Sequence, residues 1–207
     1  MSRKHRPGVL PSRELGLALG LIVGRHLLGM EDLHYGYWPD DLPLVPTNLP
    51  RAQALYTDQL LARIPDGARR ILDVGCGAGH TAARLVQLGY QVDCVSPNPV
   101  LNGMVRERLG DQVGLFEGRF EEVALQGPYD LILFSESLLF IHLQPGLERA
   151  QALLRPGGHV LISDLFRTTP ERGPGFRLCR RRRRRRCRRA GFAQPAGTPE
   201  TSAHRLP

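Results

Sequence analysis

The sequence predicts an α/β protein built on a Rossmann-like, mostly parallel sheet with helices on both faces. Its short apolar segments are almost uninterrupted by polar residues, which is typical of strands buried on both sides of a sheet. Segments with helical periodicity separate most of these strands, as in βαβ units. A glycine-rich turn follows the first strand, at the sheet edge where such folds bind ligands. The predicted strands are residues 70–74, 91–95, 113–116, 129–134 and 159–164.

Five segments have the apolar spacing of amphipathic helices. The apolar side of the first, over residues 12–29, is formed by Leu15, Leu19, Ile22 and Val23. The second covers residues 51–64 and ends at a Pro-Asp-Gly turn. The other helices are predicted over residues 79–88, 99–109 and 144–154, and the turn Arg155-Pro156-Gly157-Gly158 leads into the last strand.

These elements divide the chain into three parts. Residues 1–66 hold two helices and an aromatic segment, and residues 67–166 form the alternating core. Residues 167–207 are rich in Pro, Gly and Arg and contain few large apolar side chains. We therefore expect a partly disordered tail.

The net charge of +8 comes from one short segment. Nine arginines lie between Arg180 and Arg189, and without them the chain is close to neutral. Such a tract could contact nucleic-acid phosphates, but we interpret it as a low-complexity expansion. The charge is local, so it does not indicate a basic field over the whole surface.

The cysteines and the N-terminal apolar run both indicate in which cellular compartment the protein is located. The four cysteines lack CxxC and Cys/His spacings, so we predict no metal site. Cys76 and Cys94 are interpreted as small apolar residues in a reducing compartment. The apolar run Leu15 to Gly24 is too short to span a bilayer, and no small-x-small cleavage site follows it. We expect a cytoplasmic protein without a membrane partner.

The stretch from Ile71 to His80 indicates the type of ligand. It combines a buried strand, an acidic residue near the strand's end and three glycines at alternate positions. No lysine follows, which excludes a P-loop, and His80 stands where the dinucleotide fingerprint needs glycine. The remaining pattern, DxGxGxG, resembles motif I of the class I S-adenosylmethionine (SAM)-dependent methyltransferases. This resemblance implies a Rossmann-like fold, methyl transfer and SAM as the cofactor. It also implies a final hairpin of strands, for which the residues after Phe192 have too little strand character, so we expect the C-terminal part of the fold to be atypical or truncated.

The resemblance also implies which residues contact the cofactor. Motif I would lie against the methionine and ribose portions through Asp73, Gly75, Cys76, Gly77 and Gly79. Most of the family ends its second strand with an acid that binds the ribose hydroxyls, and this chain has Ser96-Pro97 there. A serine hydroxyl would bind ribose more weakly than a carboxylate, and Ser96 could instead serve the turn. Asp93 comes three residues too early and should point into or along the sheet.

The adenine end of the site is predicted after the third strand. The family often places an Asp and an apolar residue there, and the aligned residues in this chain are Arg119 and Phe120. Phe120 can supply an apolar face and a backbone N–H. Arg119 cannot accept a hydrogen bond from the adenine amino group, so Glu121 could take that part.

Polar residues follow the fourth predicted strand directly. We expect Ser135 beside the cofactor, because this strand should end at the ligand edge of the sheet. Glu136 resembles the acid that lies beside the transferred methyl group in several small-molecule methyltransferases. Our hypothesis is that Glu136 or His142 orients or deprotonates the acceptor. Glu136 could equally cap the next segment, and His142 could be an ordinary loop histidine.

The aromatic segment His34-Tyr35-Gly36-Tyr37-Trp38 resembles the HxGYW stretch of methyltransferases of the tocopherol and sterol type. The resemblance implies that Tyr35, Tyr37 and Trp38 help to close over cofactor and acceptor. Aromatic faces suit a sulfonium cation, which is attracted to ring quadrupoles. The alternative is that these rings pack the N-terminal helices onto the sheet.

Three functions are compatible with these features. Motif I, the Glu136 segment and the aromatic segment favour SAM-dependent methylation of a small-molecule acceptor, which is our prediction. An RNA or protein methyltransferase is favoured only by the arginine tract. A non-catalytic SAM-binding protein is suggested by Ser96 in place of the ribose acid. The acceptor and the oligomeric state are not indicated.

Overall fold

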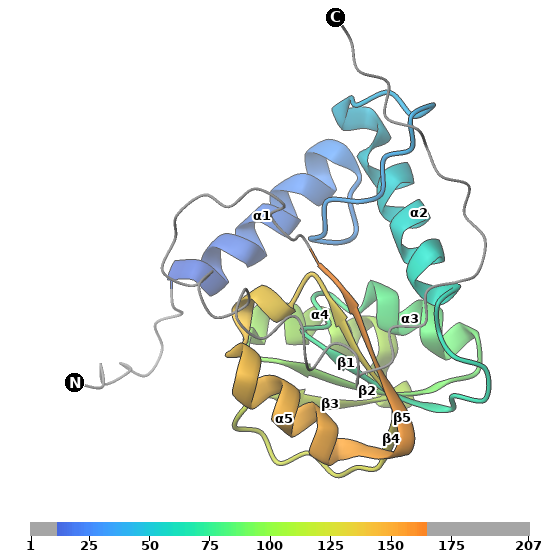
Figure 1. Cartoon of the computed structure of the whole chain (residues 1–207). Coiled ribbons are helices and arrows are strands. Elements are labelled where there is room, and N and C mark those ends of the chain that lie inside the picture. Colours follow the sequence, from blue (N-terminus) through green and yellow to red (C-terminus); the bar gives the residue numbers. More distant parts are fainter. Residues whose placement is uncertain (1–11, 165–207) are drawn as a thin grey trace, which may run out of the picture. The chain divides into compact units, whose positions relative to one another are not determined.

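The computed structural model describes residues 12–164, which form a five-stranded parallel sheet with helices on both faces (Figure 1). The strands are β1 (Arg70–Val74), β2 (Gln91–Ser96), β3 (Val113–Glu117), β4 (Tyr129–Ser135) and β5 (Leu154–Ser163). Their order is β3-β2-β1-β4-β5, and all neighbours are parallel. The predicted α/β fold with a Rossmann-like parallel sheet is therefore confirmed, whereas the predicted atypical or truncated C-terminal part lies outside the described residues. The strand order reverses between β1 and β4, and open α/β sheets bind ligands at such a switch point.

The helices lie close to where the periodicity predicts them. They are α1 (Ser12–Leu28), α2 (Leu49–Leu61), α3 (His80–Gln87), α4 (Pro99–Leu109) and α5 (Leu143–Leu153). Helix α4 begins where its sequence dictates, because the Asn98 side chain accepts hydrogen bonds from the N–H groups of Val100 and Leu101. None of the helices over residues 12–164 is long and apolar enough to cross a membrane.

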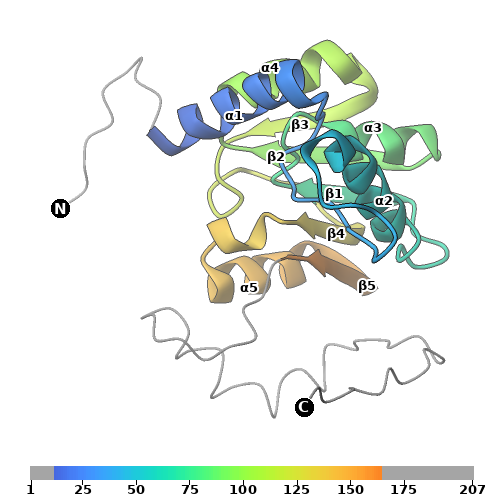
Figure 2. The ribbon, with the colours of Figure 1, turned by 90° about the horizontal axis from the view of Figure 1, so that it is seen from above.

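Two apolar clusters form the core, one on each face of the sheet. On one face, Leu60 of α2, Leu85 of α3 and Val105 of α4 pack with Ile71 of β1. On the other face, Ala150 of α5 packs with Leu72 of β1 and with neighbouring strands. Figure 2 shows α3 and α5 on opposite sides of the strands. The continuous apolar character of the strands follows from this double burial.

Helix α1 buries a different side from the one its large apolar residues predict. Ala18 and Leu21 are each 2% exposed, and Leu21 packs with Ala78 and Leu101. The predicted apolar side is 38–52% exposed, at Leu15, Leu19, Ile22 and Val23. The helix is apolar around most of its circumference, so periodicity alone cannot select the buried face.

The last strand begins earlier than predicted. The sequence predicts a turn over residues 155–158. In the structure, β5 already starts at Leu154, which pairs with Tyr129. The register then shifts, and Leu131 pairs with His159. The extra residues form an irregularity that Gly157 accommodates with a φ of +77°. Because β5 is an edge strand of the described sheet, this irregularity is tolerated without breaking a second ladder.

Candidate active site

A cavity of about 370 Å³ lies at the carboxyl edge of the sheet, around the ends of β1, β2 and β4. Residues from the segment between α1 and α2 line it as well. Such a volume and position are typical of a site for a small ligand. Most of the predicted site residues line it, namely Tyr35, Asp73, Gly75, Cys76, Gly77, Ser96, Pro97, Arg119, Phe120, Ser135 and Glu136.

The glycine turn after β1 combines tight packing with open space. Gly75 has a φ of +78°, and a Cβ there would lie 2.5 Å from the Cβ of Ser137. Ser137 is held in place because its hydroxyl donates a 2.5 Å hydrogen bond to the Val74 carbonyl. Gly77 has a φ of +56°, and a Cβ there would meet no atom within 4 Å. Packing therefore requires a glycine at 75, whereas Gly77 leaves room beside the cavity for a ligand.

Asp73 is a buried carboxylate without a complete set of partners. Its side chain lines the cavity, the residue is 1% exposed, and its Oδ2 has no hydrogen-bond partner in the described part of the chain. Burial, together with the nearby carboxylate of Asp32, raises the pKa of Asp73 to about 7. A cationic ligand in the cavity would provide the missing partner.

At the end of β2, Ser96 is buried and lines the cavity. Its Oγ accepts a 3.3 Å hydrogen bond from the Asn98 N–H, so it serves the turn before α4. Asp93 belongs to a separate network, as expected from its early position. Its Oδ2 lies 2.8 Å from both Arg70 Nη2 and the Tyr129 hydroxyl. No carboxylate of β2 therefore reaches the cavity.

The residues after β3 form the end of the cavity that was predicted for adenine. Phe120 is 3% exposed, and its ring packs edge-to-face on Phe134 at 5.7 Å between centroids. Arg119 lies 3.5 Å from Glu121, whose Oε1 also accepts a 3.1 Å bond from the His142 N–H. Burial raises the pKa of Glu121, but the backbone N–H groups and Arg119 outweigh burial, so the net shift is downward. Glu121 is thus already paired within the chain.

Glu136 has a strained backbone at the rim of the cavity. Its φ of +49° lies in the left-handed region, which a non-glycine residue rarely adopts. Its N–H donates a 2.7 Å bond to the Ser163 carbonyl, and its Oε2 accepts a 3.3 Å bond from the Tyr35 N–H. Burial raises the pKa of Glu136 above its ordinary value, and Asp164 adds to this effect. The side chain therefore links the aromatic segment to the end of β4.

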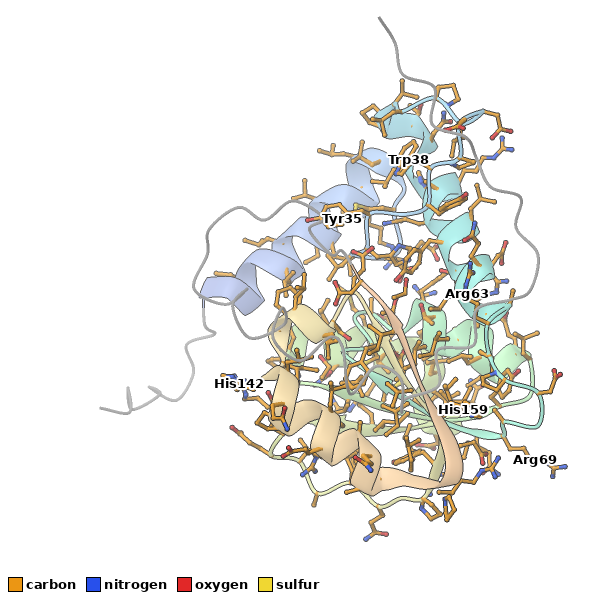
Figure 3. All side chains as sticks on the ribbon, viewed as in Figure 1. Tyr35, Trp38, Arg63, Arg69, His142 and His159 are labelled. Carbon is orange, nitrogen blue, oxygen red and sulfur yellow. The ribbon has the colours of Figure 1, made fainter. Side chains whose placement is uncertain are left out.

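Four predicted residues do not line this cavity. A Cβ at Gly79 would lie 3.1 Å from Val105 Cγ2, so this glycine allows α3 and α4 to pack closely. His142 is exposed at the start of α5, away from Tyr35 (Figure 3). The Trp38 Nε1–H donates a 2.9 Å bond to the Tyr35 carbonyl, and Tyr37 lines a second cavity. Cofactor contact by Gly79 and catalysis by His142 are therefore not supported by this geometry.

The structure adds residues that the sequence did not single out. Asp32 and His34 line the cavity, and His34 Nε2 lies 3.2 Å from Asp32 Oδ2. The Gln53 side chain of α2 donates bonds of 2.9 and 2.8 Å to the carbonyls of these two residues. The His34 ring stacks on Tyr56 at 4.3 Å. Only His34, as part of the aromatic segment, carried a local signal.

Within residues 12–164, no group of three or more His, Cys, Asp and Glu side chains is arranged to hold a metal ion. Cys76 and Cys94 are buried free thiols. The arginine tract, Cys179 and Cys187 lie outside the described residues.

A parallel sheet with a motif I turn, a buried acid and a cavity at the switch point defines the class I methyltransferase fold. The family model described as "Methyltransferase domain" matches residues 48–199. The chain therefore belongs to the methyltransferase domain family. This membership confirms the resemblance to class I SAM-dependent methyltransferases and SAM as the cofactor.

Individual proteins agree with this assignment. Methyltransferase GfsG of Streptomyces halstedii is 32% identical over 145 residues, covering 65% of this chain and 51% of that protein. A ubiquinone biosynthesis O-methyltransferase of Xanthomonas axonopodis is 31% identical over 138 residues, covering 64% and 57%. The chain thus spans only about half the length of the curated relatives it matches.

Solved structures share the fold. A putative sarcosine dimethylglycine methyltransferase from Galdieria sulphuraria superposes with a TM-score of 0.61 at 23% identity, over 73% of this chain and 59% of that one. The [4+2]-cyclase SpnF superposes with a TM-score of 0.58 at 23% identity, over 74% and 56%. These similarities concern the fold alone.

Proposed function

We propose that this protein is an enzyme that transfers the methyl group of SAM to a small-molecule acceptor. The observation that carries the proposal is the unpartnered Oδ2 of Asp73 in the cavity that Gly77 leaves open. A buried carboxylate without a partner is costly, and a cationic cofactor offsets that cost. The name of the ubiquinone biosynthesis O-methyltransferase supports a small-molecule acceptor.

The cavity offers a partner for each part of the cofactor. Asp73 and the backbone around Gly77 would hold the charged methionine portion, and the Ser96 hydroxyl would bond to the ribose. Phe120, with Pro97 beside the same cavity, would provide an apolar surface for adenine. We propose that Tyr35, whose backbone is bonded to Glu136, closes one side of the site.

The chemistry asked of the protein is modest. Bound SAM supplies a methyl group that is already activated by its sulfonium sulfur. The chain has to align the acceptor with that methyl group and exclude water. We propose that Glu136 orients the acceptor and takes its proton, because it lines the cavity and burial raises the pKa of this carboxylate above its ordinary value, which makes it a better base.

Gly77 allows a sharp test of the cofactor site. We expect Gly77→Ala to weaken SAM binding at least about tenfold in calorimetric titration, because the added methyl group enters the ligand space. Gly89→Ala is the matched control, since Gly89 has a φ of +88° and no atom within 4 Å of its Cβ position. Both variants lose stability through backbone strain, but only Gly77→Ala should lose affinity. Equal SAM binding by the two variants would contradict the proposed site.

Catalysis itself is tested by product formation. S-adenosylhomocysteine should form when the full chain is incubated with SAM and pools of small metabolites. SAM binding without product from any pool would favour a non-catalytic SAM-binding protein. Salt-dependent RNA binding that disappears on deletion of residues 179–189 would favour the RNA methyltransferase alternative.

Two further expectations remain proposals. We propose that residues 1–66, 67–166 and 167–207 act as N-terminal helices with lid, cofactor-binding core and tail. We also propose a cytoplasmic location, which cell fractionation would test.

A further inference from the structure

A second cavity, of about 330 Å³, lies beside the first, between α2 and the end of β5. Glu136 and Asp164 line both cavities. A ligand in the second cavity would therefore lie next to the side chain to which we assign the proton transfer. Methyl transfer needs the acceptor held next to the donor methyl group, and two adjacent cavities that share Glu136 allow this.

The aromatic segment contributes to the walls of both cavities. Tyr35 lines the first cavity and Tyr37 the second. Gly36, between them, has a φ of +80°, and a Cβ there would lie only 2.7 Å from the carbonyl carbon of Ala52 in α2. The Tyr37 N–H donates a 2.8 Å bond to the carbonyl of the same alanine. The segment is thus held against α2 with one tyrosine in each cavity.

The inner wall of the second cavity suits a flat apolar group. The Tyr56 hydroxyl lies 3.0 Å from Ser135 Oγ and donates a 3.3 Å bond to the Ser163 carbonyl, which fixes its ring. Leu60 of α2 and Leu161 of β5 add aliphatic surface. The other lining residues include the polar residues Gln59, Arg63, Glu136, Ser163 and Asp164. The aromatic and aliphatic part of the wall favours an apolar body of about the size of one ring.

The rim of the second cavity carries a cation. Arg63 follows α2, lines the cavity and is exposed (Figure 3). Its Nη1 donates a 2.6 Å bond to the Gln59 carbonyl, and it forms no ion pair with any acid in residues 15–164. A guanidinium binds carboxylates through a planar pair of N–H groups. An anchored guanidinium that has no acidic partner among residues 15–164 therefore favours a ligand with a carboxylate.

We propose that the second cavity binds the methyl acceptor, and that this acceptor is a small carboxylate with a ring-sized apolar body and a nucleophilic hydroxyl or amino group. The carboxylate pairs with Arg63, the body lies between Tyr37 and Tyr56, and the nucleophile meets Glu136. Its lone pair forms the new bond to the methyl carbon, whose bond to sulfur breaks with the electron pair remaining on sulfur. The acceptor proton passes to Glu136 and then to solvent. This inference rests on the proposed function.

Matched ligand pairs test the inference on the full chain loaded with S-adenosylhomocysteine. The probes are 4-hydroxyphenylacetate and 4-aminophenylacetate, each paired with its neutral amide, and affinities come from ligand-observed NMR titration. We expect each carboxylate to bind about five- to tenfold more tightly than its amide. Arg63→Gln should remove that preference. Arg51→Gln, an exposed arginine of α2 that does not line the cavity, should keep it.

The outcomes separate this inference from the proposed function. Equal affinities within each pair, no binding of either member, or a preference that survives Arg63→Gln would overturn the acceptor class. Calorimetric titration of the same samples with S-adenosylhomocysteine reports on the cofactor site alone. Failure of that titration would overturn the proposed function, whereas a normal titration with no carboxylate preference would overturn only the inference drawn here from Arg63.

Discussion

Asp73, which we propose contacts the cofactor, is held in surroundings that cost the folded protein stability. The side chain is almost fully buried, beside the acidic Asp32, and one of its oxygens has no partner among residues 15–164. Each of these conditions disfavours the ionised carboxylate in the absence of a cation. A side chain that lowers the stability of the protein without ligand and strengthens ligand binding is typical of a functional site.

The first prediction concerns Asp73→Asn. The folded protein keeps the Asp73 proton up to a pKa of about 7, whereas the unfolded chain releases it near 3.8. Between these values the folded state binds more protons, so the free energy of unfolding falls as pH rises and levels off above about 7. Asp73→Asn should lack this fall, and at pH 8 it should be more stable than the parent by on the order of a few kcal/mol. Denaturant titrations of both proteins at pH 5 and pH 8 measure the difference.

The same substitution should damage binding. We expect Asp73→Asn to weaken SAM binding about tenfold or more in calorimetric titration, because a neutral amide replaces the anion that faces the cofactor. A variant that is less stable at pH 8, or that binds SAM like the parent, would contradict the role given to Asp73.

The second prediction concerns Glu136→Gln. The amide oxygen can still accept the bond from Tyr35, so the variant should fold and bind SAM normally. Loss of the proton acceptor should lower kcat about 10²- to 10⁴-fold. In the parent, kcat should rise with pH as the Glu136 carboxyl, whose pKa is raised by burial, loses its proton. Steady-state rates at saturating SAM from pH 5 to 9 test both points, and an unchanged kcat would remove Glu136 from catalysis.

At the scale of elements, the segment between α1 and α2 is positioned by close backbone contact. Gln53 binds the carbonyls of Asp32 and His34, and Gly36 lies against Ala52. Neither contact involves the aromatic side chains of Tyr35, Tyr37 and Trp38, from which the sequence predicts a lid. The order of the segment therefore depends on α2.

The third prediction compares Gly36→Ala with Gly67→Ala. Both glycines have a φ of +80°, but only at Gly36 would a Cβ meet backbone atoms within 3 Å. Gly67→Ala should cost about 1 kcal/mol through backbone strain alone. Gly36→Ala should cost about 2 kcal/mol or more, and it should also weaken SAM binding by displacing His34 and Tyr35. Urea titration and calorimetry measure the two effects, and equal costs would show that the contact with α2 is unimportant.

At the scale of the whole described sheet, different residues serve stability and binding. The cavity lies where β1, β2 and β4 end. Arg70, at the start of β1, joins Asp93 of β2 to Tyr129, at the start of β4. The Arg70 guanidinium also lies 4.5 Å from the centre of the Tyr129 ring. This network ties three neighbouring strands together without contributing to the cavity.

The fourth prediction concerns Asp93→Asn. Removing the charge weakens the bonds to Arg70 and the Tyr129 hydroxyl, so we expect a loss of about 1–3 kcal/mol of stability in denaturant titration. SAM affinity should stay within about twofold of the parent. A large loss of affinity in the folded variant would mean that Asp93, and not Ser96, acts toward the cofactor.

The sequence predicted the sheet and the glycine turn because their signals are local. Continuous apolar strands, an Asp near the strand's end and alternating glycines all lie within a few residues of one another. The predicted residues that do not line the first cavity are positioned by contacts between distant parts of the chain. Gly79 matches the motif but does not line the first cavity, and a Cβ there would lie 3.1 Å from Val105 Cγ2 of α4. Asp32 carries no local pattern, and its place in the first cavity depends on the hydrogen bond that Gln53 of α2 donates to its carbonyl. Tyr56 lines the second cavity because of the packing of α2.

The separation of Tyr35 and Tyr37 by one glycine has a consequence for engineering. Because the two rings line different cavities, the compartment beyond Tyr37 can be reshaped while the surface that faces the cofactor is retained. Libraries confined to Tyr37, Gln59 and Leu161 would explore new acceptors at little risk to donor binding. Substitutions around Tyr37, near one end of the five-residue aromatic segment, can thus change the range of acceptors while Tyr35 is kept.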